Sequence, residues 1–227
     1  MYEIINQPKF IFMKSLENKL YIARNIEGEP NTEVLNDLRD FDKEMSQIPE
    51  FISLCPQGST VRGYSVDKSD IDLAILYDSG GIKYNTPEYW EVQKKIAERA
   101  QEIKSEIWDA KKQLSERPKN FQFRFGDINQ EVMENNLANG RHKELAYLVS
   151  LNTGKRIESY RNYWKEKINA MPKDEKEIVI NGILDILVSN TDIDIKTLSE
   201  RTDVESEEEL LEKRRELWKK RIENFLA

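Results

Sequence analysis

Two aspartates separated by one residue, Asp70 and Asp72, have the spacing in this sequence that is most typical of metal chemistry. They precede a short apolar segment ending at Tyr77, which predicts a buried strand. Residues two apart on a strand point to one face, with Cα atoms about 6–7 Å apart, so both carboxylates are expected to face the same way. Two such charges near an apolar core favour a divalent cation between them, and hard oxygen ligands suit Mg²⁺.

A possible phosphate-binding turn lies just upstream of this pair. Gly58 and Ser59 follow the apolar segment Phe51 to Leu54, which reads as another buried strand. A glycine lets the backbone approach a ligand closely, and a serine at the start of a helical turn offers its hydroxyl and amide groups to phosphate oxygens. Carboxylates for a metal beside such a turn indicate phosphoryl or nucleotidyl transfer rather than hydrolysis at a carbonyl.

Together these residues form a longer pattern. The spacing Gly58-Ser59, three residues, Gly63, five residues, then Ser69-Asp70-Ile71-Asp72-Leu73 resembles the signature of the DNA polymerase β-like nucleotidyltransferase superfamily. The resemblance implies a mixed sheet flanked by helices, a nucleoside triphosphate bound by Gly58, Ser59 and Ser69, and two Mg²⁺ or Mn²⁺ ions held by aspartates. It also implies transfer of a nucleoside monophosphate to an acceptor hydroxyl, with release of pyrophosphate. The pattern does not choose a member of the superfamily.

Members of this superfamily carry a third carboxylate on a later strand. The alternating segment 121–125 predicts that strand, but its polar positions are Gln122 and Arg124, and the first acid is Asp127. If Gly126 forms a bulge that re-aims the chain, Asp127 would complete the second metal site and accept the proton of the acceptor hydroxyl. The alternative is that Asp127 is a strand-end or helix-capping aspartate.

Other residues of types that can take part in chemistry are expected to have structural roles. The sequence Asp192-Ile193-Asp194 repeats the acidic pair without a glycine-serine turn before it, which favours a surface segment. The single cysteine, Cys55, lies in an apolar segment and is expected to be a small buried hydrophobe. The single histidine, His142, has no cysteine or histidine neighbour in sequence, which argues against zinc or a histidine-based triad.

The amino-acid composition limits which binding partners are expected. The chain has 227 residues and a formal net charge of −7, which weighs against a long nucleic acid as substrate. The sequence has no apolar run long enough to span a bilayer and no signal-peptide pattern at its start, so we expect no membrane association and a cytoplasmic location. The sequence leaves three classes of acceptor open, which are a small molecule, an RNA end and a protein side chain. The competing class is a non-catalytic module that binds a nucleotide or a protein on the same fold.

Hydrophobic periodicity predicts mostly helices outside these strands. An apolar stripe predicts a helix over 32–48, and Thr86-Pro87 predicts the start of a long helix that ends before Pro118. The expected fold is α+β, with a nucleotidyltransferase domain over 1–130 and a helical bundle over 131–227. The bundle helices are expected at 142–151, 156–169, 174–189 and 205–226. The third should be buried nearly all round, and the last should carry a salt-bridged exposed face.

Overall fold

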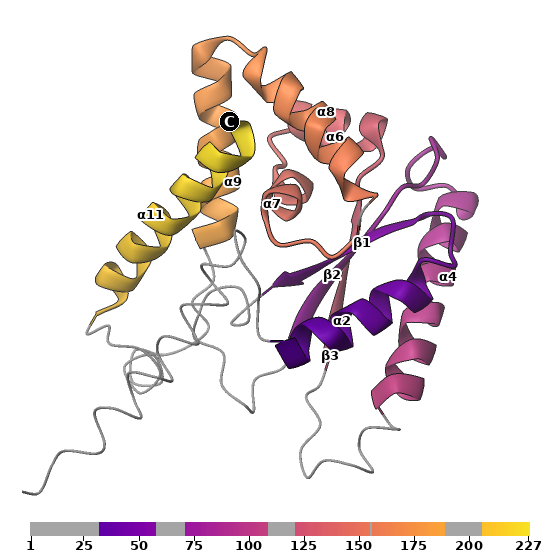
Figure 1. Ribbon diagram of the computed structural model, residues 1–227. Helices are drawn as coiled ribbons and strands as arrows, with labels where there is room; N and C mark the ends of the chain where they lie inside the picture. Colours follow the sequence, from indigo (N-terminus) through magenta and orange to yellow (C-terminus); the bar gives the residue numbers. More distant parts are fainter. Residues whose placement is uncertain (1–31, 58–70, 109–120, 155, 189–205) are drawn as a thin grey trace, which may run out of the picture.

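The computed structural model describes residues 32–57, 71–108, 121–154, 156–188 and 206–227 (Figure 1). These residues form an α+β fold in which helices predominate and three strands make one small mixed sheet. The expected α+β class is therefore confirmed. No helix within the described ranges combines the length and the apolar character needed to cross a membrane.

The sheet has its second strand in the centre. Its strands, in spatial order, are β1 (Phe51–Gln57), β2 (Ile71–Tyr77) and β3 (Phe121–Asp127). β1 runs antiparallel to β2, whereas β3 runs parallel to it. One end of the sheet therefore pairs Gln57 with Asp72, and the other pairs Tyr77 with Asp127.

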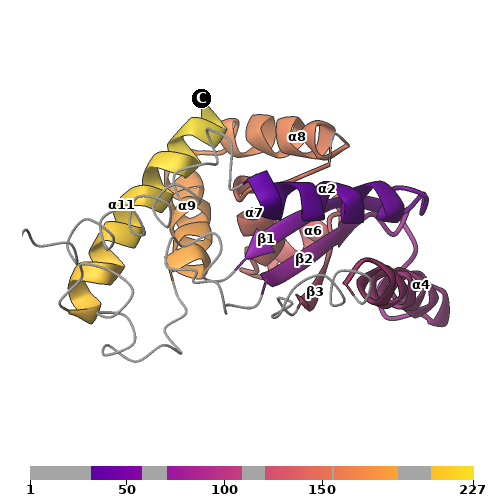
Figure 2. The same ribbon diagram turned by 60° about the horizontal axis from the view of Figure 1, so that its bottom comes forward.

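Alternation along β2 divides the core into two layers. Leu73, Ile75 and Tyr77 pack in a cluster with residues of α2 (Thr32–Met45) and α4 (Pro87–Ile103). Ala74 and Leu76 belong instead to the cluster formed with the C-terminal helices. Side chains on successive strand residues point to opposite faces, so each face of the small sheet is covered by its own helices (Figures 1 and 2).

The helices before and after β2 follow the predicted patterns in part. The apolar stripe of α2 is buried at Leu38, Phe41 and Met45. The backbone N–H of Tyr89 donates to the Thr86 side chain, which caps α4 as predicted, with Pro87 in the first turn. A π-helical turn, η1 (Lys104–Trp108), follows α4 directly, and the rest of the helix expected before Pro118 lies outside the described residues.

Helices make up most of the described chain after β3. Its helices are α6 (Gln130–Ala138), α7 (Lys143–Val149), α8 (Ile157–Asn169), α9 (Lys173–Val188) and α11 (Glu207–Leu226). Figures 1 and 2 show α9 and α11 on the side of the sheet away from α4. A single apolar cluster joins β1 and β2 to these helices, so the two regions predicted as 1–130 and 131–227 share a core.

Two expectations for the bundle need correction. α9 is not buried all round, because Ile178 is 66% exposed while Ile183 and Leu187 lie in the core. α11 has the predicted surface ion pairs, including Lys213 with Glu209 at 2.9 Å. However, its Arg214 and Arg221 are buried, at 4% exposure each, and the Arg221 guanidinium lies 4.4 Å from the Trp218 ring centre. The basic residues of α11 therefore do not all belong to a solvated face.

Cys55 has the structural role expected from its position. It is fully buried in β1, and its Sγ donates to the carbonyl oxygen of Tyr147 at 3.4 Å. Burial raises the pKa of the thiol to about 12, so the thiolate needed for nucleophilic chemistry does not form near neutral pH. Cys55 thus acts as a packing residue between the sheet and α7.

Candidate functional site

The first candidate site is the end of the sheet where β1 finishes and β2 begins. Gln57, the last residue of β1, pairs with Asp72 near the start of β2. The chain leaves this end toward Gly58 and returns to it at Ile71. Of the predicted site residues here, Gly58, Ser59, Ser69 and Asp70 lie outside the described residues. Asp72 is half-buried on the central strand.

The neighbours of Asp72 on β3 come from the polar face of that strand. Asp72 pairs with Gln122, and Ala74 pairs with Arg124. Directly paired residues point to the same face of a sheet and lie about 5 Å apart across the strands. Asp72, Gln122 and Arg124 therefore share one face. The sequence identified both β3 residues as polar but did not assign them to the site, because the pairing of β2 with β3 was not known.

Asp127 does not belong to this end of the sheet. It pairs with Tyr77, five residues beyond the pairing of Asp72 with Gln122. Five strand residues span about 16 Å, and an odd offset turns the side chain to the opposite face. The prediction that Asp127 completes a metal pair with Asp72 is therefore wrong. The residue beside Asp72 on this face of β3 is a neutral amide, Gln122.

The predicted bulge at Gly126 is also absent. Pairing continues without a shift from Leu76 with Gly126 to Tyr77 with Asp127. A Cβ atom on Gly126 would lie 3.0 Å from the Tyr147 ring and 3.1 Å from the Leu76 side chain. The glycine is needed because α7 approaches the sheet closely at this point, not because the strand bends.

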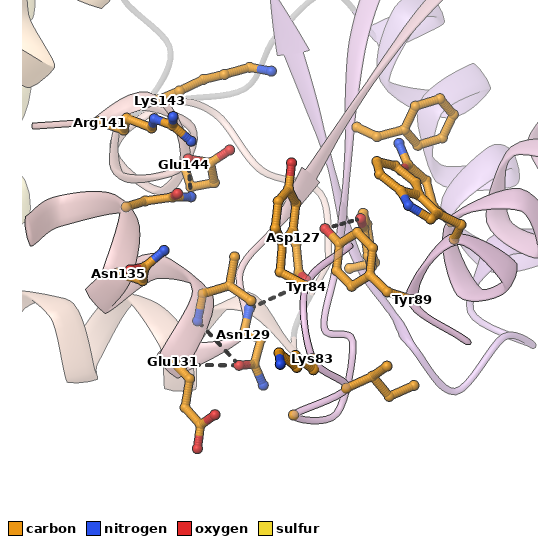
Figure 3. Close-up of a pocket in the computed structure, with 18 of the residues that line it drawn as sticks. Lys83, Tyr84, Tyr89, Asp127, Asn129, Glu131, Asn135, Arg141, Lys143 and Glu144 are labelled. Carbon is orange, nitrogen blue, oxygen red and sulfur yellow. Dashed lines mark hydrogen bonds between the residues drawn. The ribbon is translucent and has the colours of Figure 1, made fainter. Parts of the chain in front are cut away.

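A cavity of about 740 Å³ lies at the second end of the sheet, where β2 and β3 both finish. Figure 3 shows Asp127 in the middle of this region, with Tyr89 of α4 on one side and Arg141 and Glu144 on the other. Ligands of sheets with parallel strands commonly bind beyond the carboxyl ends of those strands. The volume is within the range typical of small-molecule sites, about 300–1,000 Å³.

Asp127 is held at the floor of this cavity by one of its two oxygens. Oδ1 accepts hydrogen bonds from the backbone N–H groups of Ser79, at 3.2 Å, and Asn129, at 2.9 Å. Asn129 in turn caps α6. Asp127 therefore orders the strand end, as the alternative reading of this residue expected. Its Oδ2 is buried and has no hydrogen-bond partner among the residues that the structure describes.

The electrostatic environment of Asp127 disfavours its charge. Burial raises its pKa above the usual value for aspartate, although the hydrogen bonds to Oδ1 oppose the shift. Burial likewise raises the pKa of Glu144, and the negative charge of Asp127 adds to that effect. The Tyr89 hydroxyl lies 3.0 Å from that of Tyr77, and the pKa of Tyr89 is raised to about 12, chiefly by burial.

Asp78 forms a separate network beside the cavity. The Tyr160 hydroxyl donates to one carboxylate oxygen of Asp78 at 2.6 Å, and the Asn129 side chain donates to the other at 2.9 Å. Burial alone would raise the pKa of Asp78, but these bonds and one from the Gly80 N–H hold it below its usual value. Tyr160 thus joins α8 to the end of β2, which is a structural role.

The single histidine lines the same cavity as Asp127 but packs against α9. His142 is buried, and a Cβ atom on Gly182 would lie 2.2 Å from its ring, so the imidazole packs directly on α9. Burial lowers the pKa of His142. In the described part of the chain, no three histidine, cysteine or acidic side chains are grouped as metal ligands.

Comparisons of the chain with protein-family models, with curated proteins and with solved structures find no match.

Proposed function

We propose that this protein is a metal-dependent nucleotidyltransferase that transfers a nucleoside monophosphate from a nucleoside triphosphate to an acceptor hydroxyl. The observation that supports this most is the register of β1 with β2. Because Gln57 pairs with Asp72, the segment leading into Gly58 and Ser59 departs from the sheet end at which the acidic pair begins. The two halves of the motif are thus connected to one end of one sheet.

The carboxylate oxygens of the aspartate pair are ligands that suit a hard cation. Asp70 and Asp72 would hold Mg²⁺ or Mn²⁺, which when bound supplies neutralisation of the charge on the phosphates. Gly58 and Ser59 hold the β- and γ-phosphates, and Ser69 supports the nucleotide beside the first carboxylate. Arg124, which lies on the same face as Asp72, adds a guanidinium group for phosphate oxygens.

The reaction balances without a further cofactor. The acceptor oxygen forms a bond to the α-phosphorus, the bond from that phosphorus to the bridging oxygen breaks, and pyrophosphate leaves with the electron pair. The proton of the acceptor hydroxyl passes to solvent, since the side chain paired with Asp72 on β3 is the amide of Gln122, which is not a base.

The acceptor class follows from charge rather than from geometry. A protein with a net charge of −7 lacks the overall basic character that a long polynucleotide favours. A small cationic molecule is therefore the preferred acceptor. An RNA end and a protein side chain are the other acceptors that the assay should include.

One observation favours a second candidate function, a nucleotide-binding module without transfer activity. Asp127 is remote from Asp72, and its place is taken by Gln122, which brings no negative charge to a second metal ion. Such a site would bind a nucleotide with one metal ion and would not catalyse transfer. Both candidate functions therefore predict nucleotide binding, and only the transferase predicts turnover.

The deciding experiment incubates the full chain with Mg²⁺ and each of four labelled nucleoside triphosphates, alone, with small amines and aminoglycosides, with total RNA and with cell extract. We expect a labelled acceptor and pyrophosphate from the wild type. The Asp72→Asn variant should lose roughly a hundredfold or more in rate, because charge neutralisation dominates such transition states. Equal rates for the two proteins would remove the enzyme proposal.

Asp127→Asn is the matched control, because it makes the same chemical change at the other end of the sheet. It should retain the transfer rate. Calorimetry with a magnesium–nucleotide complex separates the two candidate functions. Binding that Asp72→Asn weakens, without any turnover by the wild type, would favour the binding module.

A further inference from the structure

Exposed aromatic side chains gather at the cavity beyond the ends of β2 and β3. The described part of the chain exposes three large apolar side chains, and two of them, Tyr84 at 55% and Trp90 at 45%, line this cavity. The third, Ile178, lies on α9 and does not line it. Apolar surface that a protein keeps exposed in one place commonly marks a binding site. The position of the two rings therefore points to a ligand of this cavity.

The loop before α4 holds these rings in place. Trp90 Nε1 donates to Oδ1 of Asn85 at 3.1 Å, and the ring centres of Tyr84 and Trp90 lie 6.2 Å apart. Asn85 is the one non-glycine residue within the described ranges that has a positive φ, at 65°. Strained backbone of this kind persists where the surrounding structure requires it, and it is common at functional sites. Rings that are already ordered lose little entropy when a ligand packs on them.

Amide side chains line the cavity beside the rings. Gln93 lies three residues after Trp90 and four after Tyr89, so it shares their face of α4. Asn135 of α6 also lines the cavity, and Figure 3 shows it across from Tyr89. An amide has both a donor and an acceptor, so it can pair with a ring edge that carries the complementary groups. Aromatic rings and amides together are the groups that proteins use to bind nucleobases.

The charges at the cavity balance. Its lining has as many basic as acidic side chains, namely Lys83, Arg141 and Lys143 against Asp127, Glu131 and Glu144. The overall charge therefore favours neither a cation nor an anion. An uncharged ligand, held by ring contacts and hydrogen bonds, suits such a lining. The cavity volume of about 740 Å³ accommodates a ligand of nucleoside size.

We propose that this cavity binds a nucleoside through its flat, uncharged heteroaromatic base. The base packs on the exposed rings of Trp90 and Tyr84, and its edge forms hydrogen bonds with the amides of Gln93 and Asn135. The site is distinct from that of the proposed transfer reaction, because it lies at the end of the sheet opposite to Asp72. Binding here needs no metal ion and does not depend on nucleotidyl transfer.

Calorimetry of the full chain with adenosine and with uridine tests the proposal, in buffer that contains EDTA and no added metal ion. Ribose, which has the sugar without a base, and benzyl alcohol, which has a ring without hydrogen-bonding nitrogens, are the comparison ligands. At least one nucleoside should bind roughly tenfold or more tightly than both, because it combines stacking with edge hydrogen bonds. Asp72→Asn should bind the nucleosides as the wild type does.

Three variants locate the binding. Trp90→Ala should weaken nucleoside binding roughly tenfold, whereas Trp90→Phe keeps a stacking ring and should retain most of the affinity. Gln93→Leu keeps the approximate shape of the side chain without its amide and should weaken nucleoside binding roughly fivefold. Ile178→Ala is the matched control, because it removes an exposed apolar side chain away from the cavity. It should leave the affinity unchanged.

The proposal is overturned if neither nucleoside binds more tightly than ribose, or if Trp90→Ala binds as the wild type does. It is also overturned if Asp72→Asn or Ile178→Ala loses as much affinity as Trp90→Ala, because binding would then lie elsewhere. Thermal unfolding shows whether each variant is folded. Should Trp90→Ala fail to fold, the loss of affinity in Gln93→Leu, or its absence, decides the question.

Discussion

The two ends of the sheet hold aspartates of the same kind in opposite situations. Asp72 is half-buried at the start of the central strand, next to the polar residues Gln122 and Arg124. Asp127 is buried at the end of the edge strand, with one oxygen held by backbone N–H groups and a cavity in front of it. The comparison shows that strand register and sheet face decide which site an acidic residue belongs to. Its position in the sequence does not decide this.

The largest expected effect separates the two aspartates by activity. Asp72→Asn should lower nucleotidyl transfer roughly a hundredfold or more. Asp127→Asn should keep the transfer rate, because Asp127 lies at the other end of the sheet. Both rates are measured side by side with the wild type. A similar loss of transfer in Asp127→Asn would mean that the two ends of the sheet are not independent.

The next largest effect concerns the close packing of Gly126 in β3 against α7. Gly126→Val should lower the free energy of unfolding by about 2 kcal/mol, because the new side chain meets the Tyr147 ring and Leu76. Urea unfolding measures the change. Adding Tyr147→Leu should recover part of the loss by removing the ring. No recovery would mean that the strand itself, and not the contact with α7, resists the substitution.

A gain of function tests the role of Gln122. If the side chain paired with Asp72 occupies the place of a third carboxylate, Gln122→Asp should raise transfer or magnesium-dependent nucleotide affinity about tenfold. Arg124→Gln should instead raise the nucleotide KM, since it removes a phosphate contact. Kinetic titration with Mg²⁺ and nucleotide distinguishes the two. An unchanged magnesium dependence in Gln122→Asp would place the metal away from β3.

The smallest effect is a difference in the pH dependence of stability. The pKa of Asp127 is higher in the folded chain than the unfolded value of about 3.9, so its charged form opposes folding above the raised pKa. As pH falls through that raised value, the penalty disappears and the wild type gains stability relative to Asp127→Asn. Urea unfolding of both proteins between neutral pH and pH about 4 measures the difference. The opposite slope would show that the hydrogen bonds to Asp127 outweigh the effect of its burial.

Local patterns predicted much of the secondary structure. The stripe of apolar residues in 32–48 fits the buried face of α2, the cap at Thr86 starts α4, and the alternation in 121–125 fits β3. These predictions succeed because each depends on neighbours within one or two turns or along one strand. The exposed Ile178 and the buried Arg214 and Arg221 were not predicted, because burial depends on which helices meet.

The sequence alone determined the spacing of Gly58 and Ser59 from Asp70 and Asp72, on which the resemblance depends. It also placed Asp127 close to the end of a predicted strand, and the structure has it as the last residue of β3. Only the tertiary structure decided that β3 lies parallel to β2 with Gln122, and not Asp127, beside Asp72. The reason is physical. Moving a residue by an odd number along a strand reverses its face, and strand register is set by contacts between segments far apart in sequence.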